Sequence, residues 1–290
     1  MISVPDMDSI RAAIIAAFPD LADASFKVLE PGWDSTAVDI DDRLVFKFPR
    51  SESAERALRR EAGLLAAIRP RVTMPVPDLA LHSGPPVFSR HPKLRGDHLL
   101  APQYERLPDE ARQLLAGQIA LFYAQIHGLD PQVMQAAGAT PIKAWLPAEA
   151  ILEKALPALP SGFRSWARET ISAWQHLPPD PCGTTYGFFD GHGWNMAFDH
   201  ANNRLNGIYD FADSGFGSLH QEFIYSNLIS ADLTARIVAA YEKLTARMLD
   251  RRRIALLTGV HRLSELAELA DDPKHRPMMI RQVTSWAKRP

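Results

Sequence analysis

The stretches YGFFDGHGWNMAFD at residues 186–199 and IYDFADSGFG at residues 208–217 surround two short apolar runs with oxygen-bearing side chains. The segment DHANNR between the two runs is rich in turn residues, so we expect a β-hairpin. In an antiparallel pair, the start of the first strand lies beside the end of the second. Asn195 and Asp210 should therefore share one end of the hairpin, with Asp190 on the loop that leads into it.

Oxygen-bearing side chains gathered at one point suit a hard cation such as Mg²⁺, bound together with the phosphates of a nucleotide. In this interpretation Asn195 and Asp210 bind the metal ion, while Asp190 accepts or orients the proton of an acceptor hydroxyl group. The alternative is that aspartate and asparagine simply mark turns, which is their commonest use. The hairpin alone leaves both interpretations open.

A second constellation lies nearer the N-terminus. In the stretch RLVFKFP, strand alternation puts Phe46 and Phe48 on one face and Lys47 on the other. Glu61 falls on the apolar stripe of the next expected helix, where an unpaired carboxylate would be costly. A lysine on a sheet and a glutamate on the following helix satisfy each other, and kinases use this arrangement to hold the α and β phosphates. The order of these two residues before D-x-x-x-x-N and D-F favours a phosphate site over a surface lysine and a boundary glutamate.

Length and pattern predict an α+β chain with two lobes. At 290 residues the chain exceeds the roughly 150 residues typical of one domain. Helical spacing starts near Asp6, extended segments follow to about residue 90, and one main helix interrupts them near residues 51–68. Long helical patterns dominate afterwards, and the glycines of DSGFG fit a flexible loop. The expected division is a small N-terminal β-sheet lobe (1–90), a connector (91–96) and a larger, mostly helical C-terminal lobe (97–290).

Composition limits the partners that can be expected. Lys and Arg total 32 against 34 acidic residues, so the formal charge of −2 gives no field that attracts nucleic acid or an anionic membrane. Cys182 is the single cysteine, which excludes an internal disulfide and fits a reducing compartment. Apolar runs stay below the ~20 residues of a membrane span, and the N-terminus lacks a signal-peptide pattern. We expect a cytoplasmic monomer or homodimer that acts on a small molecule.

These pieces together resemble the aminoglycoside phosphotransferase family, small-molecule kinases that share the protein-kinase fold. The matching segments span nearly the whole chain and read PGWDSTAVDI, VFKFP, RREAGLL, IHGLDP, FFDGHGWNMAFD and GIYDFADSGFG. The resemblance implies a catalytic role for Asp190, metal binding by Asn195 and Asp210, and phosphate binding by Lys47 with Glu61. It also implies a nucleotide-covering loop and a connector past the purine ring, with the cofactor-binding candidates Gly32, Ser35, Thr36, Ser89 and His91.

Two departures from the family pattern affect the catalytic loop. Phe188 and Phe189 stand where the family usually has His-Gly before the aspartate, and Ala212 replaces the glycine after D-F. The family histidine is mainly structural, so its loss removes no proton carrier. Two bulky rings there put the catalytic rate in doubt more than nucleotide binding.

The expected activity is Mg²⁺-dependent transfer of the γ-phosphate of ATP or GTP to a hydroxyl group of a small molecule, with an aminoglycoside antibiotic as a candidate acceptor. An alternative acceptor is another metabolite, such as a choline-like amine, a sugar or an amino-acid alcohol. A nucleotide-binding pseudokinase with weak catalysis is the alternative from another class. Because aminoglycosides are polycations, carboxylates should line their cleft. The candidate substrate-binding residues are Asp213, Glu222 and Trp194.

Overall fold

The computed structural model describes residues 6–29 and 35–289, so Gly32 lies outside the described residues. The N-terminal elements are α1 (Met7–Ala17), β1 (Phe26–Val28), β2 (Ser35–Ile40), β3 (Leu44–Pro49), α2 (Glu52–Ile68), β4 (Ala80–His82) and β5 (Phe88–Pro92). The elements that follow are α3 (Ala101–Tyr104), α4 (Asp109–His127), α5 (Pro131–Ala136), α6 (Ala148–Ala158), α7 (Arg164–Gln175), β6 (Thr184–Gly187), β7 (Met196–Asp199), β8 (Arg204–Ile208), β9 (Gly215–Ser218), α8 (Ala231–Thr245), α9 (Arg251–Glu268) and α10 (Arg276–Ala287).

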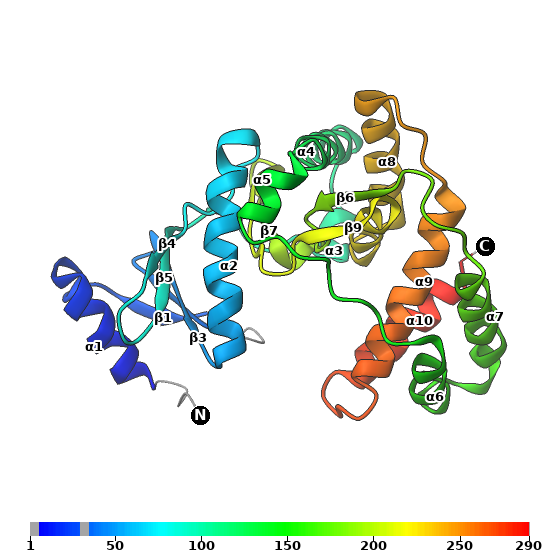
Figure 1. Cartoon of the computed structure of the whole chain (residues 1–290), viewed down its shortest axis with the longest axis horizontal. Coiled ribbons are helices and arrows are strands. Elements are labelled where there is room, and N and C mark those ends of the chain that lie inside the picture. The colour runs from blue at the N-terminus through cyan, green and yellow to red at the C-terminus, as the bar shows by residue number, and fades with distance from the viewer. Residues whose placement is uncertain (1–5, 30–34, 290) are drawn as a thin grey trace.

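The first five strands form one antiparallel sheet in the order β1-β2-β3-β5-β4. One face of this sheet is apolar and carries Phe46, Phe48 and Phe88, which share a buried cluster with Ile10 and Ile14 of α1. Figure 1 shows α1 lying beside the sheet at the N-terminal end of the molecule. The alternation expected in RLVFKFP is therefore confirmed.

The opposite face of the same sheet carries polar groups. Lys47 of β3 pairs with Ser89 of β5, and Val45 pairs with His91. Directly paired residues and residues two apart point to the same face of a sheet. Lys47, Ser89 and His91 therefore face away from α1.

Helix α2 connects the sheet to the rest of the molecule. Its N-cap is Ser51, whose hydroxyl accepts the N–H of Ala54 at 3.2 Å. Leu64, Leu65 and Ile68 belong to the largest buried cluster, which continues into α4 and α8. The helix that carries Glu61 is thereby fixed against the C-terminal part of the chain.

Helices dominate that C-terminal part, as expected. Helices α4 and α8 pack side by side in its centre, while α6, α7, α9 and α10 form a second layer around a smaller apolar core at the far end (Figure 1). Over the described residues, no helix is both long enough and apolar enough to cross a bilayer. The fold is thus α+β, whereas the lobe boundaries at residues 90 and 96 stay predictions. The N-terminal sheet itself continues to Pro92.

The remaining strands of the described residues form two small antiparallel pairs. Strands β7 and β8 form the expected hairpin, with Met196 opposite Ile208. Strand β9 pairs with β6, placing Gly215 opposite Gly187. The flexible loop expected for DSGFG is therefore wrong, because its glycines allow close approach of the segment at residues 140–142 and of the Phe189 ring.

Candidate active site

The open end of the β7–β8 hairpin brings the predicted metal-binding residues together. The N–H of Tyr209 donates to the carbonyl of Asn195 at 3.0 Å, which places Asp210 next to Asn195. Asn195 Nδ2 donates to Asp190 Oδ2 at 2.6 Å and to the Asp190 carbonyl at 3.1 Å. Asp190, Asn195 and Asp210 thus converge as the hairpin geometry predicted.

Lys47 links this hairpin end to the N-terminal sheet. Its Nζ lies 3.1 Å from Asp210 Oδ1 and 3.6 Å from Glu61 Oε1. Burial alone would lower the pKa of Lys47, but the charges of Glu61 and Asp210 outweigh it and raise that pKa. The positive charge of Lys47 in turn holds the pKa of Asp210 below its ordinary value. Lys47 therefore lies between two acidic side chains, and its contact with Glu61 is the Lys-Glu arrangement that kinases use beside phosphates.

Two residues of the site have left-handed backbone conformations. Phe189 has a φ of 53° and Asp210 a φ of 70°. This region is disfavoured for residues with a Cβ, and such strain concentrates at functional sites. The N–H after Asp210, that of Phe211, donates to the buried Glu61 Oε1 at 3.0 Å. Glu61 therefore fixes both Lys47 and the backbone that presents Asp210.

Glu222 was expected to contact substrate, and the structure contradicts this. Its side chain is fully buried, and its two oxygens accept the N–H groups of Phe188 and Phe189, each at 2.9 Å. His127 Nε2 lies 3.1 Å from Glu222 Oε2, and the other ring nitrogen of His127 lies 2.9 Å from the Tyr241 hydroxyl. Glu222 thus holds the loop before Asp190 from beneath. Because the Glu222 carboxylate is fully buried and bound to the loop backbone and His127, a substrate cannot reach it.

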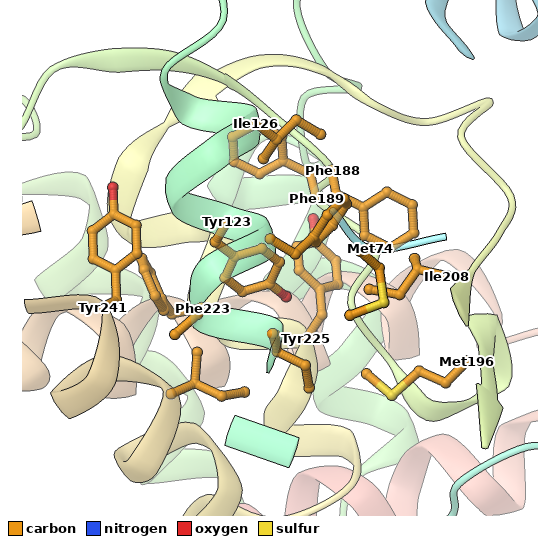
Figure 2. Packing of buried hydrophobic residues seen from close by; sticks show 14 of the residues in the cluster. Met74, Tyr123, Ile126, Phe188, Phe189, Met196, Ile208, Phe223, Tyr225 and Tyr241 are labelled. Carbon is orange, nitrogen blue, oxygen red and sulfur yellow. The ribbon is translucent and has the colours of Figure 1, made fainter. Parts of the chain in front are cut away.

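The two phenylalanines before Asp190 are part of the main core. Phe188 is fully buried, with its ring centroid 4.8 Å from that of Phe211 and 6.0 Å from that of Phe122. Figure 2 shows Phe188 and Phe189 among the other large side chains of this cluster. Burial of one such ring contributes about 2 kcal/mol. The Phe-Phe pair therefore anchors the loop before Asp190 to the core through contact of Phe188 with Phe211.

His192 and Trp194 flank Asp190 on the loop. His192 Nε2 lies 3.1 Å from Asp190 Oδ1, and Trp194 packs edge-to-face on the His192 ring at 5.4 Å. Burial, the largest single effect, would lower the pKa of His192, but the hydrogen bond to Asp190 and the charges of Asp190 and Glu265 together raise that pKa. The Trp194 side chain is partly exposed, and Asp213 is exposed two residues after Phe211. Both can therefore still reach a bound molecule.

The nucleotide-binding candidates divide between the two faces of the sheet. Ser35 begins β2 instead of lying in a loop, and it shares the face of Lys47. Thr36 pairs with Phe48 and so points to the face of α1, where its hydroxyl accepts a hydrogen bond from Arg50 Nε at 3.2 Å. The expectation for Thr36 is therefore wrong, because strand alternation turns its side chain away from Lys47. Ser89 and His91 lie within β5 on the face of Lys47, and their contact with a nucleotide stays a prediction.

The residues at the hairpin end fit a hard divalent cation. Asn195 donates through Nδ2 to Asp190, so its amide oxygen is directed elsewhere, and about half of the Asp210 side chain is exposed. Mg²⁺ prefers one or two protein oxygens and takes the rest of its ligands from phosphates and water. Asp210 and Asn195 supply that donor set.

Three residues near Asp190 were not identified from the sequence. The negative charge of Glu265 on α9 acts on the pKa of both His192 and Tyr225, and the charge of Asp190 acts on the pKa of Tyr225 and Tyr123. Glu265 Oε2 is buried, accepts no hydrogen bond and lies 3.5 Å from His261 Nδ1. The i, i+4 spacing of His261 and Glu265 was the available sequence signal, but helical spacing alone cannot direct them toward Asp190.

A further polar group, formed by Asp180, Cys182 and His220, lies outside this site. His220 Nδ1 is 2.8 Å from both oxygens of Asp180, and the N–H of Asp250 donates to His220 Nε2 at 2.9 Å. Both ring nitrogens are therefore occupied within the protein. These hydrogen bonds connect the loops that carry Asp180 and Asp250.

The fold and the sequence can be compared with known proteins. The wild-type aminoglycoside 2′-phosphotransferase-IIIa in its GDP complex superposes with a TM-score of 0.82 at 20% identity, covering 98% of this chain and 99% of that one. The streptomycin-ATP ternary complex of APH(2″)-IIa gives a TM-score of 0.68 at 17% identity, with coverage of 98% and 97%. The apoenzyme of the macrolide 2′-phosphotransferase from Brachybacterium faecium gives 0.72 at 17% identity, with coverage of 96% and 98%.

At these identities the structural likeness establishes the kinase-like fold alone. A sequence model described as the phosphotransferase enzyme family matches residues 25–257, well over half of the chain, and the match includes Lys47, Glu61, Asp190, Asn195 and Asp210. The resemblance inferred from the motifs is confirmed: this chain belongs to the phosphotransferase enzyme family.

Proposed function

We propose that this chain transfers the γ-phosphate of ATP or GTP, with Mg²⁺, to a hydroxyl group of a small molecule. The observation that carries the proposal is the position of Lys47 between Glu61 and Asp210, at 3.6 and 3.1 Å. These contacts join three distant segments of the chain into one cationic point beside a carboxylate and an amide. An ion pair that only stabilised the fold would not need to lie next to the Asp190–Asn195 pair. Its position there favours a role in phosphate binding.

Each residue has a proposed part in the transfer. Lys47 binds the α and β phosphates, and Glu61 keeps the ammonium group in position. Asp210 and Asn195 would hold the metal ion, which neutralises charge on the phosphates when bound. Asp190, held by Asn195 on one oxygen and His192 on the other, orients the acceptor hydroxyl and accepts its proton. Catalysis is then mainly positioning and charge neutralisation.

The acceptor is proposed from the site and from the named relatives. Solved relatives act on aminoglycosides or macrolides, and one was solved with streptomycin. Near Asp190, the carboxylate of Asp213 and the ring of Trp194 remain accessible, and the charge of Asp190 acts on Tyr225. An amine-bearing alcohol fits this mixture of carboxylate and aromatic groups, with an aminoglycoside as the first candidate. The lone Cys182 fits a reducing compartment, so the proposed location is the cytoplasm.

The direct test is acceptor-dependent release of ADP or GDP with Mg²⁺, measured over aminoglycosides, macrolides and small metabolite alcohols. A fast rate with one acceptor class supports the proposal and identifies the substrate. Nucleotide hydrolysis that no acceptor accelerates would instead support the pseudokinase alternative.

Matched variants test the metal assignment in the same assay. Asp210→Ala should abolish turnover, and a variant as fast as wild type would contradict the role of Asp210. Asp199→Asn is the control, because Asp199 lies at the other end of the same hairpin and caps its turn through the N–H groups of Ala201 and Asn202. We expect this control to retain the wild-type rate.

A further inference from the structure

His91 presents an unpaired hydrogen-bond acceptor on the sheet face that carries Lys47. It lies on β5 opposite Val45, one position along the same face from Ser89, which pairs with Lys47. The charges of Lys47 and Asp210 both act on the pKa of His91, which places its ring close to these two side chains. The imidazole therefore borders the space in which the phosphate site lies.

The hydrogen bond made by one ring nitrogen fixes the protonation of the other. His91 Nδ1 lies 2.9 Å from the carbonyl oxygen of Pro92, and a carbonyl can only accept, so Nδ1 carries the proton. Burial, the largest effect, lowers the pKa of His91 to about 4, so the ring is neutral at pH 7. Nε2 is then a lone-pair acceptor.

This acceptor is both accessible and unused. Among the described residues, Nε2 has no hydrogen-bond partner, and it is not one of the fully covered unpaired atoms. The rest of the side chain is packed, since His91 is only 6% exposed. A rigid ring with one open acceptor is suited to recognising a donor on a ligand.

The connector that follows β5 restricts where that ligand can lie. The N–H of Lys93 donates to the Arg43 carbonyl at 2.8 Å, and Asp97 exchanges two backbone hydrogen bonds with Phe198 at 2.9 and 2.8 Å. The segment is thereby attached to both the sheet and the β7–β8 hairpin. Along β5, His91 lies between Ser89, the partner of Lys47, and this fixed segment, so a nucleotide with its phosphates at Lys47 can extend its base past His91.

The two purines differ at the edge that would meet this acceptor. Adenine carries an amino group at position 6, which donates, whereas guanine carries a carbonyl oxygen, which accepts. With guanine, the position-6 oxygen and His91 Nε2 would both be acceptors, so no hydrogen bond could form between them. Nε2 could donate only if the proton moved from Nδ1, which would break the hydrogen bond to the Pro92 carbonyl. Resting on the proposed phosphotransferase function, we infer that His91 makes this enzyme selective for adenine nucleotides over guanine nucleotides by accepting a hydrogen bond from the amino group at position 6.

Direct binding of diphosphates to the whole protein tests this without an acceptor. Calorimetry with Mg²⁺ should show ADP binding about tenfold or more tighter than GDP, because an unmatched buried acceptor costs at least one hydrogen bond. Inosine diphosphate, which has the position-6 oxygen without the 2-amino group of guanine, should bind as weakly as GDP. Equal binding of ADP and inosine diphosphate, or tighter binding of GDP, would overturn the inference while the phosphotransferase proposal stands.

Two variants test whether His91 itself causes the preference for adenine nucleotides. His91→Gln offers both a donor and an acceptor at similar length, so the ADP-to-GDP affinity ratio should fall toward one. Arg90→Lys is the matched control, because Arg90 lies on the other sheet face over the Phe18 ring at 4.5 Å, and its ratio should equal that of wild type. A wild-type ratio in His91→Gln would refute the assignment. If neither diphosphate binds to wild type, the proposed function fails and this inference fails with it.

Discussion

The N–H of Phe189 donates to Glu222 Oε1 at 2.9 Å, directly before the aspartate proposed to orient the acceptor hydroxyl. Phe189 has a φ of 53°, a conformation that favours glycine and that the usual His-Gly sequence would adopt at little cost. Glu222 and the packing of the two phenyl rings hold this strained conformation. The geometry of Asp190 therefore depends on a carboxylate that no substrate can reach.

Replacing Glu222 by glutamine should destabilise the fold and slow turnover. The side chain amide has one accepting oxygen, so its NH₂ group would face a backbone N–H or His127. We expect the free energy of unfolding to fall by about 1–3 kcal/mol, the cost of leaving a buried donor unpaired. Urea unfolding measures this. Glu268→Gln, which removes only a surface ion pair with Lys143, should stay within about 0.5 kcal/mol of wild type, and equal stability of the two variants would contradict the role of Glu222.

A substitution at Tyr123 should restore the stability and kcat that a substitution at Gly191 removes. A Cβ at Gly191 would overlap the Tyr123 hydroxyl, while the ring carbon Cζ behind it lies at 3.3 Å. We expect Gly191→Ala to lower kcat and to destabilise the fold by about 1–3 kcal/mol, as overpacking does. Tyr123→Phe alone removes a buried hydroxyl that has no partner, so its cost should be small.

The double variant Tyr123→Phe with Gly191→Ala should recover most of the lost stability and kcat, because the overlapping oxygen is gone. Thermal unfolding and steady-state kinetics of the four proteins complete the cycle. Losses that simply add would show that Gly191 is needed for another reason, such as backbone freedom.

Glu61→Gln removes the charge of the Glu61 side chain but keeps its shape, so it tests whether the phosphate site needs that charge. Glutamine can still accept the Phe211 N–H, but it no longer balances the charge of Lys47. We expect kcat/KM for the nucleotide to fall by at least about tenfold, since Lys47 is then drawn toward Asp210 alone. The control is Glu55→Gln on the exposed side of the same helix, where Glu55 pairs with Arg59, and its kinetics should match wild type. Unchanged kinetics in Glu61→Gln would refute the pairing role.

His91 should make the free energy of unfolding depend on pH under acidic conditions. Its pKa is about 4 in the folded protein, against about 6.5 when unfolded. Between these values the unfolded state binds more protons, so stability rises with pH and is lost as the pH falls from about 6.5 to 4. The full effect is at most about 3 kcal/mol.

Urea unfolding of wild type and His91→Gln at pH 4.5 and pH 7 isolates this contribution. The variant should lose less stability than wild type between the two pH values. Parallel losses would show that the His91 ring is protonated without cost and is not held neutral by its surroundings.

Local pattern was sufficient for the parts of the site that lie within single elements. Alternation in RLVFKFP separated Lys47 from Phe46 and Phe48, helical spacing put Glu61 on a buried stripe, and the turn residues of DHANNR predicted the hairpin that joins Asn195 to Asp210. These features repeat every two or 3.6 residues, so a sequence reveals them without any knowledge of distant contacts.

The packing of distant segments against one another placed the remaining residues. It turned Thr36 to the face of α1, made the GFG part of DSGFG a strand beside β6, and buried Glu222 beneath Phe188 and Phe189. It also brought Glu265 toward His192 and left the Nε2 atom of His91 open beside Lys47. Register, the direction of a helix face and the burial of a charge all depend on partners many residues away, and the sequence of one element does not encode which partner it meets. Sequence pattern therefore identified the family and predicted the candidate phosphate and metal residues, whereas packing decided which carboxylates support the loop and which can meet a ligand.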